Sequence, residues 1–149
     1  MAALIARRGL DVAADRALGH YTHEKSSVGC AAALATLEVI DNEQLLLRSR
    51  TLGAQALERM RDLERRHALV ADVRGIGLLL GIELRRDGAP ACREAEQVMY
   101  RCLANGLSFK IGQGNVLTLS PPLVITAGEL DNAFAILDTA LSAVEAGSA

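Results

Sequence analysis

The sequence predicts an α+β fold in which a small, mainly antiparallel sheet has helices packed on one face. Three observations lead to this fold class. Stretches with apolar residues at every third or fourth position predict helices, and short leucine-rich or β-branched stretches predict strands. Gly, Asn and Asp mark the turns between them. With 149 residues, half of them apolar, the chain is long enough for one core.

The first predicted helix covers residues 28–40, and Ser26 or Ser27 precedes it as a cap. Its apolar residues are mostly small, so another backbone could approach it closely. We therefore expect this helix to be buried.

A second, longer helix is predicted for residues 43–67, with Asp41 and Asn42 as its cap. Arginines fill the positions between its apolar residues, and acidic residues are interleaved with them, which is typical of a solvated face. The apolar positions that we expect to face the core are Leu45, Leu52, Ala56, Met60 and Leu63.

The remaining elements are separated by turn signals. They are two strands within 68–86 joined at 75–77, a turn at 87–88, a helix over 91–105, strands at 107–111 and 115–120, and a last helix over 127–146 capped by Thr126. The apolar residues of the last helix that share one face are Leu130, Phe134, Leu137 and Leu141.

Composition argues against several classes of protein. The formal net charge is -2, only 3% of residues are aromatic and there is no Trp, so nucleic-acid binding is not favoured. Cys30, Cys92 and Cys102 show no CxxC spacing, which argues against a disulfide framework or a zinc site. No stretch is long and apolar enough to span a bilayer, and the first residues lack the apolar core of a signal peptide. We expect a cytoplasmic protein.

The stretch before the first predicted helix carries the strongest chemical signal. It contains His20, Thr22, His23 and Lys25 directly ahead of a helix N-terminus. Hydroxyls, a lysine and free backbone N–H groups at such a position favour an anion. The alternative from these residues alone is ordinary helix capping.

Three segments, YTHEKSSVGCAAALATLEVI, VADVRGIGLLLGIEL and NVLTLSPPLVIT, give the chain a family resemblance. In this order and spacing they resemble the C-terminal part of class III (subgroup II) pyridoxal-phosphate-dependent aminotransferases. The resemblance implies the C-terminal small domain of a fold-type-I enzyme, pyridoxal 5'-phosphate as cofactor, a small-molecule amine as substrate and a homodimer. Residues 1–25 would form an interface and cofactor-edge segment, and residues 26–149 the small domain. Within it, 26–66 would be the helical connection to a large domain that this sequence does not contain.

The resemblance also assigns cofactor-binding residues. A Thr of the first motif reaches across the dimer to the cofactor phosphate in this family, and Thr22 occupies that position. His23 follows it, and the Thr-His pair resembles the dialkylglycine decarboxylase branch. Both residues are therefore expected to bind the cofactor.

The substrate-binding motif departs from the family pattern. Many members have an Arg that binds the substrate carboxylate where this sequence has Thr118. A hydroxyl cannot form that bidentate contact, unless Arg74 or Lys110 replaces the arginine. This change favours an amine without an α-carboxylate, or a phosphorylated or phosphonate amine, as in the phospholyases and aminophosphonate lyases that this segment also resembles.

The sequence lacks the family's Schiff-base lysine, because Lys25 and Lys110 do not occupy the matching motif. We assign no catalytic residue and no metal site, and we expect this chain alone to be inactive. Transamination is the default reaction of the complete enzyme, with elimination or decarboxylation as alternatives. A non-catalytic, self-associating module is the alternative of another class.

Overall fold

The computed structural model describes residues 7–10, 12, 15–16 and 26–147. The chain divides into two compact units, Met1–Gln44 and Leu45–Ala149. In the first unit the structure describes a short 3-10 helix, Arg8–Leu10, and helix α1, Ser27–Asn42.

Helix α1 begins where the sequence predicts. Ser26 is its N-cap, and the Ser26 hydroxyl accepts a hydrogen bond from the Gly29 N–H at 3.4 Å. The helix ends later than predicted, at Asn42, so Asp41 and Asn42 complete α1 and do not cap the next helix. Gln44, the last residue of the first unit, has a φ of 50°.

The prediction that this first helix is buried is wrong for this structure. No residue of α1 is buried, and the large side chains of Val28, Leu34 and Leu37 are 78%, 62% and 59% exposed. The only other element described in this unit is the three-residue helix Arg8–Leu10, which has no buried residue either. Nothing described in the first unit can therefore cover the apolar surface of α1.

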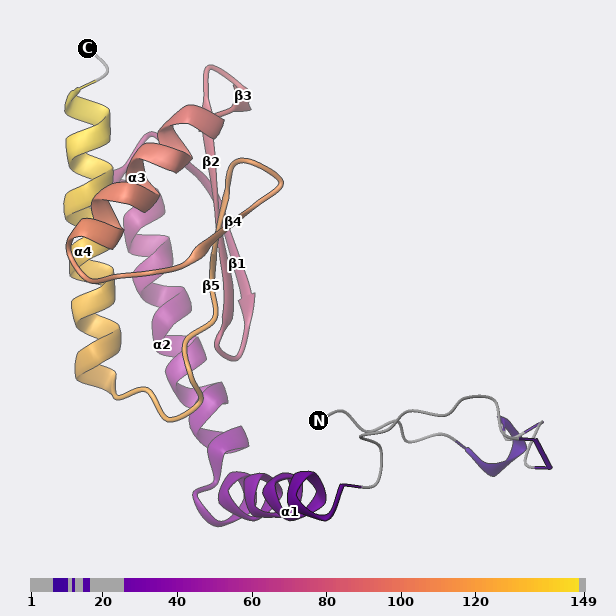
Figure 1. The fold of residues 1–149 in the computed structure, drawn as a ribbon. Coiled ribbons are helices and arrows are strands. Elements are labelled where there is room, and N and C mark those ends of the chain that lie inside the picture. The colour runs from indigo at the N-terminus through magenta and orange to yellow at the C-terminus, as the bar shows by residue number, and fades with distance from the viewer. Residues whose placement is uncertain (1–6, 11, 13–14, 17–25, 148–149) are drawn as a thin grey trace. The chain divides into compact units, whose positions relative to one another are not determined.

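The second unit confirms the predicted fold class (Figure 1). Its sheet is antiparallel in the order β1-β2-β5-β4, with a short additional strand β3 paired to β2, and the helices pack on one side of it. The elements are α2 (Leu45–Arg66), β1 (Val70–Ile76), β2 (Leu79–Arg86), β3 (Ala89–Pro90), α3 (Cys92–Ala104), β4 (Lys110–Gly112), β5 (Val116–Leu119) and α4 (Ala127–Ala146). Strand β3 is the one element of this unit that the sequence did not predict.

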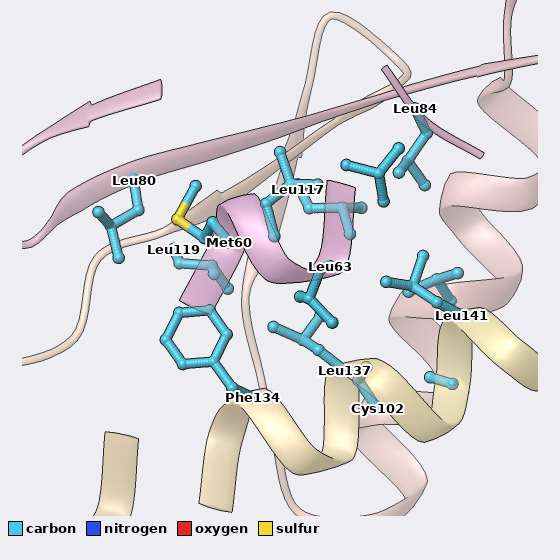
Figure 2. Close-up of a cluster of buried hydrophobic side chains, with 14 of the residues drawn as sticks. Met60, Leu63, Leu80, Leu84, Cys102, Leu117, Leu119, Phe134, Leu137 and Leu141 are labelled. Carbon is cyan, nitrogen blue, oxygen red and sulfur yellow. The ribbon is translucent and has the colours of Figure 1, made fainter. Parts of the chain in front are cut away.

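The core lies between the sheet and the three helices. On β2, Leu80, Ile82 and Leu84 are at most 2% exposed, while the residues between them are not buried. This alternation means that one face of the sheet meets the helices. Figure 2 shows Met60 and Leu63 of α2 and Phe134, Leu137 and Leu141 of α4 meeting these strands. All the core positions predicted for α2 and α4 are buried.

Local signals at the ends of α3 and α4 are also confirmed. Helix α4 begins with a capping box, in which Thr126 Oγ1 accepts from the Glu129 N–H and the Glu129 carboxylate accepts from the Thr126 N–H. Helix α3 ends at Ala104 with Asn105 as its C-cap, and the following Gly106 has a φ of +87°. No helix in the described part of the chain is both long and apolar enough to cross a membrane.

The first hairpin turns later than predicted. Ile76 pairs with Leu79, so the turn consists of Gly77 and Leu78 rather than 75–77. Gly77 has a φ of +54°, a conformation that glycine adopts without the steric cost of a side chain. Helix α2 approaches this turn so closely that a Cβ atom on Gly53 would lie 2.2 Å from the Gly77 carbonyl oxygen.

Replacing Gly53 by Ala should therefore destabilise the second unit. The new methyl group has to displace backbone atoms of the hairpin, and overpacking of this kind typically costs about 1–3 kcal/mol. The free energy of unfolding, measured by urea denaturation of the full chain, would test this. Gly128→Ala is the matched control, because nothing lies within 4 Å of a Cβ at this helical glycine. An equal effect of both substitutions would contradict the close packing of Gly53.

Candidate substrate-binding face

Two of the predicted site residues, Thr22 and His23, lie outside the described residues. The contact of this pair with a cofactor phosphate thus stays a prediction. The adjoining structure is compatible with an anion, because α1 starts five residues after Thr22 (Ser27) and has no acidic residue in its first turn. The backbone N–H groups of that turn can serve as donors to a phosphate.

The three predicted substrate-binding residues lie in one row across the sheet. Arg74 on β1 is paired with Gly81 on β2, Gly81 with Thr118 on β5, and Thr118 with Lys110 on β4. Residues that are directly opposite in neighbouring strands project to the same face. Since Leu80 and Ile82, on either side of Gly81, face the helices, the row occupies the opposite face of the sheet. The fold therefore brings Arg74, Thr118 and Lys110 together.

Arg74 is held by carboxylates at one end of the row. Its Nη1 atom donates to Asp72 and, at 3.0 Å, to Oε2 of Glu83. The Glu83 carboxylate also accepts from Arg85 Nε at 2.9 Å. The hydrogen bond from Arg85, followed by that from Arg74, holds the pKa of Glu83 below its usual range. The hydrogen bonds to Asp72 and then Glu83 raise the pKa of Arg74.

Lys110 stands at the other end of the row, and its side chain forms no ion pair with any carboxylate that the structure describes. The pair Lys110–Thr118 lies where β4 begins and β5 is about to end. A cavity of about 560 Å³ adjoins this rung, and its lining includes Lys110 and Thr118 as well as residues of α4. Most of its other lining residues are apolar, among them Phe109, Ile125 and Phe134. A positive charge and a hydroxyl thus lie beside an apolar hollow.

Sequence reasoning did not identify two features of this face. The first is the pair of carboxylates, Asp72 and Glu83, that binds Arg74. Asp72 lies two residues before Arg74, and Glu83 two residues before Arg85, and this spacing could have indicated the ion pairs. The second is the glycine at position 112, which lies next to Thr118. A Cβ on Gly112 would lie 3.3 Å from Thr118 Oγ1, so glycine there leaves the Thr118 hydroxyl uncovered on that side.

The structure provides no metal-binding group of three or more His, Cys, Asp and Glu residues within its described ranges. Cys30, Cys92 and Cys102 are all free thiols, and burial raises the pKa of Cys102 to about 11.

A model of the aminotransferase class-III family matches residues 12–141. The chain belongs to this family. Its members depend on pyridoxal phosphate, so the cofactor that the sequence resemblance implied is that of the family.

Known relatives cover almost the whole chain. It is 47% identical over 147 residues to an (R)-1-hydroxy-2-aminoethylphosphonate ammonia-lyase of Vibrio splendidus, covering 97% of this chain and 31% of that protein. It is 38% identical to an isoleucine 2-epimerase of Lentilactobacillus buchneri, covering 99% of this chain and 33% of that protein. Class III family members therefore include proteins named for reactions other than transamination.

Solved structures of the family share the fold. A phospholyase from Arthrobacter in complex with phosphoethanolamine matches with a TM-score of 0.73 and 29% sequence identity, covering 75% of this chain and 27% of that one. The chain spans about a third of the length of the curated relatives reported above. These coverages are consistent with the predicted C-terminal portion of a longer enzyme.

The carboxylates around Arg74 allow a direct test of the electrostatics of the face. Arg85→Gln should raise the pKa of Glu83 more than Arg74→Gln does, because the hydrogen bond from Arg85 is the larger cause of its lowering. Carboxyl NMR titration of both variants would measure this. Arg86→Gln is the control, since Arg86 pairs with Glu94. An unchanged Glu83 pKa in both variants would contradict the observed pairing.

Proposed function

We propose that this chain is the C-terminal part of a complete, dimeric pyridoxal-phosphate-dependent enzyme of class III. Residues 1–25 form the interface and cofactor-edge segment, 26–149 form the small domain, and 26–66 connect to the large domain. Two observations support this proposal. The chain spans only about a third of its curated relatives, and α1 leaves large apolar side chains exposed for which a longer protein would supply cover.

The cofactor, when bound, supplies the electron sink for reactions at the substrate's amino-bearing carbon. In our proposal, the Thr22 hydroxyl and His23 bind its phosphate across the dimer, with help from the backbone N–H groups at the start of α1. The catalytic lysine comes from the large domain. The isolated chain is accordingly expected to be inactive.

Thr22→Ala should weaken cofactor retention in the complete protein without affecting its fold. Loss of one hydrogen bond to a charged phosphate should raise the dissociation constant of pyridoxal phosphate about 10- to 100-fold. Fluorescence titration of the apoprotein would measure this, and Thr22→Ser, which keeps the hydroxyl, is the control. An unchanged constant in Thr22→Ala would remove Thr22 from the phosphate site.

The substrate we favour is a small amine that carries a phosphate or phosphonate group. The observation that carries this proposal is the row on the face of the sheet opposite the helices. There Thr118 and Lys110 stand together, and Lys110 has no ion-pair partner among the described residues, while Arg74 is already held by Asp72 and Glu83. An ammonium group suits a phosphate or phosphonate as a compact point charge. Of the three candidates, Lys110 is therefore the cation best placed to bind the substrate's anionic group.

Three reaction classes remain as candidates: transamination, elimination of ammonia and decarboxylation. The relative that is 47% identical is named as an ammonia-lyase, and this favours elimination. Incubating the complete protein with 1-hydroxy-2-aminoethylphosphonate, the compound in that relative's name, would separate them, because its hydroxyl is a leaving group next to the amino-bearing carbon. Ammonia released without a 2-oxo acid indicates elimination, whereas an amino group transferred only when a 2-oxo acid is added indicates transamination. If loss of carbon dioxide from a dialkylated amino acid is the sole activity, the dialkylglycine-decarboxylase-like alternative holds.

Lys110→Gln should lower kcat/KM for the phosphorylated amine about 10- to 100-fold, the cost of a charge-assisted hydrogen bond. The same amine without its phosphate should react almost unchanged, because it offers no anion to Lys110. Arg74→Gln is the matched control on the same row and should have the smaller effect. A larger effect of Arg74→Gln than of Lys110→Gln would transfer the anion-binding role to Arg74.

If the complete protein self-associates but binds no pyridoxal phosphate, the alternative of a non-catalytic module holds. For the enzyme we propose, the partners are a second copy and a small-molecule amine, without nucleic acid or membrane. The free thiols of Cys30, Cys92 and Cys102 suit the reducing cytoplasm.

A further inference from the structure

The loop between β5 and α4, residues 120–126, forms one wall of the cavity that adjoins Lys110 and Thr118. Four of its residues line this cavity, namely Ser120, Pro121, Pro122 and Ile125. Only Leu119 separates the loop from Thr118 along the chain. A shift of the loop would therefore change the shape of the cavity next to both proposed binding residues.

Backbone hydrogen bonds hold the loop at its C-terminal end. The Ile125 N–H donates to the Pro122 carbonyl at 3.0 Å, and Thr126 caps α4. The two prolines have no backbone N–H to donate. The side chains of Leu123 and Val124 are exposed, so packing does little to fix this part of the loop. A contact from another element is needed to keep the loop in one position.

Arg48 of α2 supplies such a contact. It lies in the first turn of the helix, and its Nη2 atom donates to the Ile125 carbonyl at 2.5 Å and, at the longer distance of 3.5 Å, to the Val124 carbonyl. In Figure 1 the loop passes the beginning of α2 before α4 starts. Arg48 thus joins α2 to a loop that is 77 positions away in the sequence.

The charge of Arg48 also acts on the start of α4. Hydrogen bonds from the backbone and then the side chain of Thr126 are the main causes that hold the pKa of Glu129 below its usual range, and the positive charge of Arg48 adds to them. Thr126 and Glu129 form the capping box of α4. The guanidinium of Arg48 therefore interacts with the last carbonyls of the loop and with the carboxylate that caps the next helix.

The hydrogen-bonding capacity of this guanidinium is only partly used. Arg48 Nε is buried and has no hydrogen-bond partner among the described residues. A buried donor without an acceptor reduces the stability of the folded state, which offsets part of what Arg48 contributes to it. The main contribution of the side chain is therefore local, the position of the loop.

A substrate whose anionic group binds Lys110 would lie against this loop, because both line the same cavity. We propose that Arg48 is a positioning residue for substrate binding, which holds the β5–α4 loop in place as the wall of the cavity beside Thr118 and Lys110. This inference rests on the proposed function, in which Lys110 binds the anionic group of the substrate. Arg48 acts through the carbonyls of Val124 and Ile125 and not by touching the substrate.

The contact between Arg48 and the loop can be measured without cofactor or substrate. Arg48→Gln in the full chain should speed hydrogen exchange of the Ile125 amide about 3- to 10-fold, measured by NMR, because the loop loses a hydrogen bond and opens more often. Arg59→Gln is the matched control, since Arg59 joins α2 to α4 through Asp131 and is not part of the cavity lining. Exchange at the same rate in Arg48→Gln and the unsubstituted chain would overturn the proposal.

The kinetics of the complete protein show whether this contact serves substrate binding. Arg48→Gln should raise KM for 1-hydroxy-2-aminoethylphosphonate about 3- to 10-fold and leave kcat almost unchanged, because the loop affects binding and not the reacting groups. Arg48→Lys, which keeps a cationic donor, should restore most of the loss, and Arg59→Gln should change neither constant. A lower kcat at an unchanged KM, or no change in either constant, would indicate a structural contact alone and would overturn the proposal.

The two measurements distinguish this inference from the proposed function. If the unsubstituted complete protein does not turn over the aminophosphonate, the proposed function fails, and its dissociation constant, measured by calorimetry, takes the place of KM. Arg48→Gln should then raise that constant by the same factor, and an unchanged constant, or no binding to the unsubstituted protein, would overturn the positioning role. If Arg48→Gln does not fold, Arg48→Met, which keeps the apolar stem of the side chain, replaces it in both experiments.

Discussion

One face of the antiparallel sheet has to be buried under α2, α3 and α4, and this constraint determines the arrangement of the second unit. Leu80, Ile82 and Leu84 of β2 point to the helices and are almost fully buried. Burying one such side chain stabilises a fold by about 1.5–3 kcal/mol. A slip of one residue in strand pairing would turn all three to the opposite face. The hydrophobic core therefore fixes the strand register.

The same register determines what the opposite face carries. Residues out of phase with the core come together there, and four successive partners place Arg74, Gly81, Thr118 and Lys110 in one row. The three functional candidates come from segments up to 44 positions apart in the sequence, counted from Arg74 to Thr118. Because glycine stands between Arg74 and Thr118, the row has no bulky side chain at its centre. The candidate site is thus a consequence of how the core packs.

The two units differ in how their apolar surface is covered. Helix α4 buries its apolar stripe in the core, including Phe134 and Leu137, whereas α1 has no buried residue. A helix with apolar residues on all sides is stable mainly when it is buried. The relatives of this chain are about three times as long. In our proposal the missing part of the protein covers α1, which would restore the burial that its composition indicates.

Features that depend on neighbours within one or two helical turns, and the family, could be predicted from the amino-acid sequence. The apolar stripes of α2 and α4 and the cap at Thr126 were predicted correctly, because periodicity and capping are local. Four features became known only from the three-dimensional fold: the exposure of α1, the two-residue turn at Gly77, the carboxylates that hold Arg74, and the loop that Arg48 contacts. These depend on strand register and on contacts between distant segments; Arg48 and Ile125 are 77 positions apart. No local sequence pattern indicates which carboxylate will lie next to a given side chain once the protein has folded.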